Sequence, residues 1–180
     1  MNSSVFALLA VMMSTSAVAQ EKPPARYENW GVCPFECCTY REWTADDDIP
    51  LHRSRDDRSP VVFRLHQGET VDALTGVVVT VKPGVIHIDQ SLQDGFLPGH
   101  EAPQLSLKAG DTVYMLFPLG EGSFLFWYQG KVYHSGNALA GIKGSEGTGS
   151  QMTWWKLIRN RSGQSGWTRS DRFKNVDACG

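Results

Sequence analysis

The sequence shows no strong excess of charge of either sign. Its 17 lysines and arginines nearly balance its 19 aspartates and glutamates, which leaves a formal net charge of −2. No lysine or arginine cluster appears beyond Arg159 and Arg161. Proteins that bind nucleic acid neutralise several phosphates with clustered cations, so we expect no nucleic-acid partner.

Long apolar runs are absent after residue 19. A transmembrane helix needs about 20 consecutive apolar residues, and the run at residues 5–13 is too short. That run lies in an uncharged stretch, residues 2–19, which ends in the small-x-small pattern Ala17-Val18-Ala19 typical of signal-peptide cleavage. We expect residues 1–19 to be a signal peptide, the alternative being an uncleaved anchor. The remaining chain is then expected to be periplasmic or secreted, without membrane insertion.

Signatures of catalysis and of metal binding are also missing. The histidines form no His-x-His or His-Glu-x-x-His spacing; they are His52, His66, His87, His100 and His134. The acidic run at residues 46–48 lacks the spaced ligands and the glycine of an EF-hand loop, which indicates a solvated turn. No nucleophile signature accompanies the cysteines. We therefore expect no catalytic residue, no metal and no cofactor.

The four cysteines are Cys33, Cys37, Cys38 and Cys179. In an oxidising compartment an even number indicates two disulfides, for which three connectivities exist. A bond between adjacent cysteines is strained. We therefore expect Cys179 to join Cys37 or Cys38 and Cys33 to join the other, with a zinc site as the weaker alternative.

A pattern typical of an antiparallel hairpin occupies residues 152–173. Two aromatic and β-branched runs flank a polar turn, residues 160–166, that contains two glycines. Alternation along the first run places Trp155 and Leu157 on one face and Trp154 on the other. We expect the face of Trp155 and Leu157 to pack in the core.

This hairpin, with Trp154, Lys156-Leu157, Gly166-Trp167 and Phe173, resembles the last hairpin of bacterial SH3-like (SH3b) domains. A second stretch, residues 51–54 followed by residues 59–71, resembles the opening of the same family. The resemblance implies an all-β fold made of small SH3-like β-barrels. It also implies binding of extended peptides, cell-wall peptide stems or partner proteins, which is what such domains usually do. They are seldom enzymes themselves.

The hairpin comes later in this chain than the family pattern predicts. An echo between Gly68-Glu69-Thr70-Val71 and Gly110-Asp111-Thr112-Val113 favours two barrel units over one unit with a long β insert of about 65 residues. The expected organisation is a signal peptide (1–19), a leader and cysteine-rich N-terminal cap (20–39), an incomplete first unit (40–88), a linker loop (89–104) and a second unit (105–180).

Six tryptophans are the strongest compositional signal for binding, because Trp and Tyr combine a large apolar area with a polar group. Four aromatic residues are expected to fill the core: Trp43, Phe63, Phe126 and Trp155. Three others are candidates for lining a ligand groove: Trp154, Trp167 and Tyr128.

The function that the sequence favours is therefore an exported, non-catalytic SH3-like binding module. Its expected partner is a peptidoglycan peptide or an envelope protein. One alternative is a secreted inhibitor of a hydrolase such as lysozyme, which would insert loops at residues 95–101 and 137–150. Another is a hydrolase whose paired carboxylates are not visible in sequence spacing.

Overall fold

A computed structural model describes residues 21–142 and 149–179 of the chain, so the expected signal peptide lies outside the described residues. The described part is mostly β, as expected, with one short helix. In chain order the elements are β1 (Tyr27–Trp30), β2 (Glu42–Ala45), β3 (Ile49–His52), β4 (Val61–Leu65), β5 (Thr70–Lys82), β6 (Gly84–His87), β7 (Leu92–Asp94), β8 (Leu105–Leu107), β9 (Thr112–Gly120), β10 (Ser123–Tyr128), β11 (Lys131–His134), α1 (Asn137–Ala140), β12 (Gln151–Arg159), β13 (Ser165–Thr168) and β14 (Phe173–Lys174).

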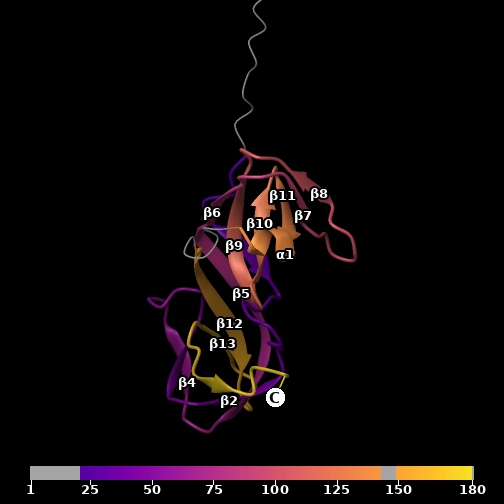
Figure 1. Cartoon of the computed structure of the whole chain (residues 1–180). Helices are drawn as coiled ribbons and strands as arrows, with labels where there is room; N and C mark the ends of the chain where they lie inside the picture. Colours follow the sequence, from indigo (N-terminus) through magenta and orange to yellow (C-terminus); the bar gives the residue numbers. More distant parts are fainter. Residues whose placement is uncertain (1–20, 143–148, 180) are drawn as a thin grey trace, which may run out of the picture.

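The largest sheet has eight strands and curls into a half-barrel at one end of the molecule (Figure 1). Its order is β14-β2-β5-β12-β13-β3-β4, and β1 pairs with β5 outside this path. The expected hairpin is present as β12 and β13, which pair antiparallel from Lys156↔Thr168 to Arg159↔Ser165. The early strand β1, which lies within the expected cap, pairs with residues 77–80 of β5.

A long antiparallel pair, β5 with β12, joins the two ends of the elongated molecule (Figure 1). Residues 76–80 of β5 are buried at every position. This stretch is Gly followed by three valines and a threonine, and β-branched residues suit a strand that is covered on both faces. The pair therefore forms a stiff centre on which the other elements pack.

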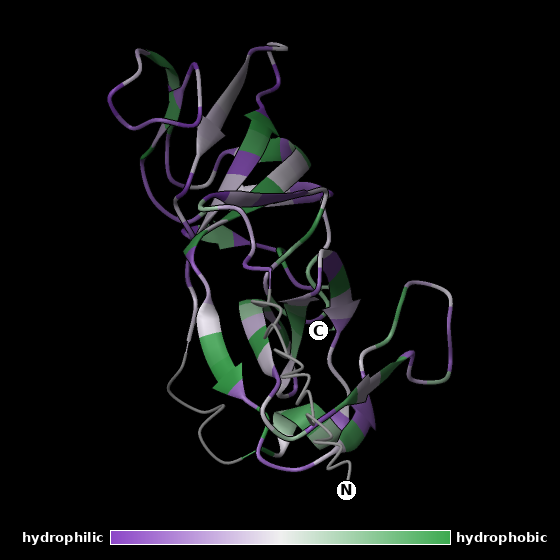
Figure 2. Cartoon of the chain, turned by 90° about the horizontal axis from the view of Figure 1, so that it is seen from above, coloured by the Kyte–Doolittle hydropathy of each residue, from purple (hydrophilic) through white to green (hydrophobic). Residues whose placement is uncertain are grey.

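A four-stranded antiparallel sheet, β11-β10-β9-β6, lies at the other end with the short pair β7-β8 and helix α1 (Figure 1). It has its own core, which includes Ile86, Val113, Phe126 and Leu139. Buried Asp94 fixes α1 to β7, because its carboxylate accepts hydrogen bonds from the backbone of Gly136 (2.5 Å) and Leu139 (2.7 Å). Hydrophobic segments coincide with strands in both parts of the molecule (Figure 2).

The expected units 40–88 and 105–180 do not form separate sheets. Strand β12 of the second expected unit pairs along its whole length with β5 of the first, from Gln151↔Lys82 to Arg159↔Asp72. The four-stranded sheet is built from residues between these two strands. The expected linker 89–104 also contains a strand, β7, which pairs with β8.

The core faces of β12 differ from the expectation. Trp154 and Ile158 belong to the largest buried cluster, whereas Trp155 packs with Val77 and Val79 in a smaller one on the other face. Leu157 is only half-buried. The side chains alternate as predicted, but both faces of β12 are covered, so the alternation does not identify the main core. Burial is confirmed for Trp43, Phe126 and Trp155, while Phe63 is partly buried.

Candidate functional site

Two disulfides involve the N-terminal cap, one within it and one that joins it to the C-terminal segment. Cys33 pairs with Cys38, and Cys37 pairs with Cys179, 142 positions away; this is one of the two pairings that the sequence left open. Two backbone hydrogen bonds also join the cap to the C-terminal segment. The N–H of Thr39 donates to the carbonyl of Val176 (3.0 Å), and the N–H of Ala178 donates to the carbonyl of Cys37 (2.8 Å). Disulfides indicate an oxidising, extracytoplasmic environment. No helix of the described residues is long and apolar enough to span a bilayer.

A pocket of about 810 Å³ lies between this cap, the C-terminal segment and the inner face of the half-barrel. Its lining comprises Pro34 and Phe35 of the cap, Trp43 of β2, residues 152–154 and Lys156 of β12, Arg169 and Asp171 of the loop after β13, and Phe173, Asn175, Val176 and Asp177 near the C-terminus. Two regions that are distant in sequence, residues 34–43 and residues 152–177, therefore contribute to one site. The Cys33–Cys38 bond encloses Pro34 and Phe35 of the lining, and the Cys37–Cys179 bond joins this stretch to the C-terminal segment.

Trp154 is the centre of the aromatic wall of the pocket. Its ring makes edge contacts with Phe35 (centroids 5.7 Å apart) and with Trp43 (6.0 Å). Trp43 also packs against Phe173 at 5.4 Å. Trp43 is fully buried and Trp154 is 8% exposed, whereas Phe35 is 38% exposed. The wall thus runs from a fixed core tryptophan to a phenylalanine at the surface.

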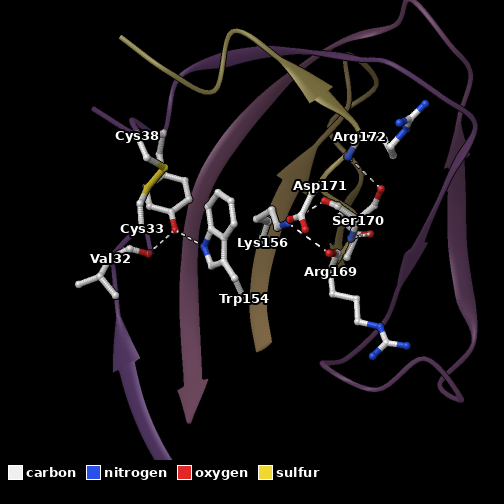
Figure 3. Close-up of polar contacts among 11 residues, drawn as sticks. Val32, Cys33, Cys38, Trp154, Lys156, Arg169, Ser170, Asp171 and Arg172 are labelled. Atoms are coloured by element: carbon white, nitrogen blue, oxygen red, sulfur yellow. Dashed lines mark hydrogen bonds and ion pairs between the residues drawn. A yellow bond between two sulfur atoms is a disulfide. The ribbon is translucent and has the colours of Figure 1, made fainter. Parts of the chain in front are cut away.

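A hydrogen-bond chain fixes the orientation of Trp154 (Figure 3). The indole Nε1 donates to the Tyr40 hydroxyl at 2.8 Å, and that hydroxyl donates to the carbonyl of Val32 at 2.7 Å. Burial raises the pKa of Tyr40 to about 12. The Tyr40 hydroxyl therefore stays protonated and continues to donate its hydrogen bond to the Val32 carbonyl in the cap.

Lys156 is a fully buried cation at the base of the pocket. Its Nζ donates to the carbonyls of Arg169 (3.2 Å) and Ser170 (2.7 Å) and pairs with the Asp171 carboxylate (2.5 Å), as Figure 3 shows. It also lies 4.2 Å from the centre of a Trp154 ring, a cation–π geometry. Burial lowers the pKa of Lys156, and Asp171 opposes that shift. Because three oxygen atoms of residues 169–171 accept hydrogen bonds from Nζ, this lysine holds the loop after β13 in place.

The structure separates the three expected groove residues. Only Trp154 lines the pocket. Trp167 lies on the opposite face of the sheet against Trp30, with ring centroids 5.9 Å apart. Tyr128 lies in the four-stranded sheet, where its hydroxyl donates to Asp111 at 2.9 Å.

Sequence reasoning missed the roles of Phe35, Tyr40, Lys156 and Phe173 in this site. Phe173 and Lys156 were part of the hairpin motif, so the motif could have marked them. Phe35 stands between Cys33 and Cys37, and this position gave the only signal that it belongs to an ordered cap. Nothing in the local pattern indicated that the cap lies over β12.

One group of potential metal ligands comes together in the described residues, Cys37 with Asp177 and Cys179. Both thiols of that group are consumed by the disulfide. The arrangement at the pocket is instead suited to burying an apolar group against aromatic rings beside a polar rim.

Comparison of the chain with known protein families, with curated proteins and with solved structures finds no match.

We expect stability to fall between pH 10 and pH 12. The pKa values of Tyr40 and Tyr128 are raised from 10.0 to about 12, mainly by burial. In that window the unfolded tyrosines ionise first, so the unfolded state binds fewer protons and gains stability relative to the folded state. The pKa of Lys156 is lowered from 10.5, so this group makes stability rise with pH. That rise is complete once the pH exceeds 10.5.

Urea unfolding at several pH values measures this slope, with Tyr40→Phe as the test variant. Burial also raises the pKa of Tyr27, so removing one of these tyrosine hydroxyls should make the fall in unfolding free energy shallower but not abolish it. An unchanged slope in Tyr40→Phe would contradict the assignment of the effect to this hydroxyl.

Proposed function

We propose that this chain is an exported, non-catalytic SH3-like binding module that takes a peptide-bearing ligand in the aromatic pocket. The ligand is a cell-wall peptide or a segment of an envelope protein. The observation that carries the proposal is the pocket itself, in which Phe35, Trp43, Trp154 and Phe173 come together beneath a disulfide-held cap.

The size and chemistry of the pocket support binding. Its volume of about 810 Å³ falls within the roughly 300–1,000 Å³ of known ligand sites. The aromatic wall offers apolar area at a low entropic cost, and the exposed carboxylates of Asp171 and Asp177 lie at the rim. Such a combination suits a ligand with an apolar group attached to a polar backbone.

The curled sheet supports the SH3-like proposal. The β12–β13 hairpin carries the motif that resembles the family, and it pairs with β5 in a strongly curled antiparallel sheet. In this interpretation residues 84–149 are an insert with its own sheet. The signal-peptide pattern and the two disulfides support a periplasmic or secreted location.

The test is retention of the mature, oxidised protein on purified peptidoglycan sacculi. Phe35→Ala is the informative variant, because Phe35 is part of the wall but is not buried in the core. Trp30→Ala is the matched control, since it removes an aromatic side chain that is 52% exposed and does not line the pocket. We expect Phe35→Ala to weaken retention about tenfold or more and Trp30→Ala to leave it unchanged.

Equal retention of both variants would place the ligand elsewhere on the molecule. Muropeptides released into the supernatant would support the hydrolase alternative instead. If wild-type protein is not retained, the wall ligand is wrong, and cross-linking in the envelope should then identify a protein partner that depends on Phe35.

A further inference from the structure

One edge of β12 is open beside the pocket. The strand pairs with β5 from Gln151 to Arg159, but its pairing with β13 begins only at Lys156. Within the described ranges, no strand pairs with that second edge between Gln151 and Trp155. Unpaired backbone N–H and C=O groups in such a stretch are a template for another extended chain.

The buried lysine explains why β13 ends there. The last paired position is Lys156↔Thr168. The next three residues, 169–171, turn onto the inner face of the sheet and bind Lys156 Nζ through two carbonyls and the Asp171 carboxylate (Figure 3). The chain after β13 therefore forms a wall of the pocket and does not cover the remaining edge of β12.

The backbone groups on the open edge belong to two pocket residues. The carbonyl oxygen of Trp155 is directed to β5, since it lies 2.8 Å from the position that a Cβ on Gly76 would take. Backbone groups alternate along a strand, so the N–H and C=O of Met152 and Trp154 face away from β5. The side chains of the same two residues line the pocket.

The open stretch lacks the features that protect other edges of this sheet. Strand β4 follows Pro60 and contains Arg64, and β14 is two residues long and contains Lys174. Proline, charge and shortness all discourage edge pairing. The stretch from Gln151 to Trp155 contains neither a proline nor a charged residue.

We propose that an extended segment of an L-polypeptide adds to β12 as a strand along residues 151–155 and inserts an apolar or aromatic side chain into the pocket. The proposal rests on the proposed function and chooses between its two ligands. Strand pairing needs N–H and C=O groups at the regular spacing of an L-peptide, about 3.3 Å per residue. Cell-wall stem peptides contain D-residues, which interrupt that pattern, so a protein segment is the better fit.

The test begins with a phage-displayed library of random linear eight-residue peptides selected on the oxidised protein. The enriched peptide is then synthesised and its Kd measured for two variants at one position. Met152→Pro removes an N–H that faces the open edge and is not bonded to β5, whereas Met152→Leu keeps both the N–H and an apolar side chain. We expect Met152→Pro to weaken binding about tenfold or more and Met152→Leu to change it less than threefold.

A second measurement uses the unaltered protein, so a folding defect in Met152→Pro cannot obscure the result. Hydrogen exchange followed by NMR should show that the amides of Met152 and Trp154 exchange more slowly when the peptide is bound. Peptide binding that depends on Phe35 but not on Met152→Pro, without new amide protection, would overturn strand addition and leave the proposed function standing. Failure to enrich any peptide would also overturn strand addition, while retention on sacculi decides the proposed function separately.

Discussion

Replacing Cys37 and Cys179 together by serine is expected to lower the free energy of unfolding by about 5 kcal/mol, against about 2 kcal/mol for Cys33 and Cys38. The difference follows from the loops that the two bonds close, because the residues are 142 positions apart in the first and 5 in the second. A crosslink that closes a longer loop removes more conformational entropy from the unfolded chain.

Urea unfolding of the two double variants measures this difference, and each serves as the control for the other. Hydrogen exchange adds a local measurement. Loss of the Cys37–Cys179 bond should increase exchange at Thr39 and Ala178, whose amides join the cap to the C-terminal segment. Equal losses of stability in the two double variants would show that the unfolded-state argument does not describe this chain.

The second large effect is expected for Gly76→Ala, which should destabilise the protein by about 3 kcal/mol. A Cβ at this position would clash with the Tyr40 hydroxyl, and it would lie 2.7 Å from Trp154 Nε1 and 2.8 Å from the Trp155 carbonyl oxygen. The carbonyl is part of the β5–β12 pair and cannot move freely. The added methyl therefore forces Tyr40 and Trp154 apart and breaks their hydrogen bond.

Gly149→Ala is the matched control, because no heavy atom lies within 4 Å of the position that its Cβ would take. The specific test is a double variant: Tyr40→Phe removes the hydroxyl that meets the new methyl, so it should restore part of the stability lost in Gly76→Ala. Urea unfolding of the two single variants and the double variant gives the coupling free energy. Additive losses would indicate that the clash with Tyr40 is not the cause.

Several features of this protein could be read from sequence because their signals are local or chemically restrictive. The β12–β13 hairpin has aromatic runs around a glycine turn, and alternation of its side chains does not depend on what packs against it. The cysteine pairing was narrowed to two choices, since adjacent Cys37 and Cys38 are poorly placed to bond with each other. Neither argument needed to know which strands become neighbours.

Tertiary structure alone decided where those local pieces meet. Strand β12 pairs with β5 although the strands of the four-stranded sheet lie between them in the sequence, and no local pattern encodes that long-range choice of partner. Trp154 belongs to the main core because the cap covers its face, and Lys156 is buried because three acceptors from the loop after β13 reach it. The pocket has the same origin: its walls come from segments brought together by long-range pairing and by the bond from Cys37 to Cys179, and such contacts leave no periodic signal in the sequence.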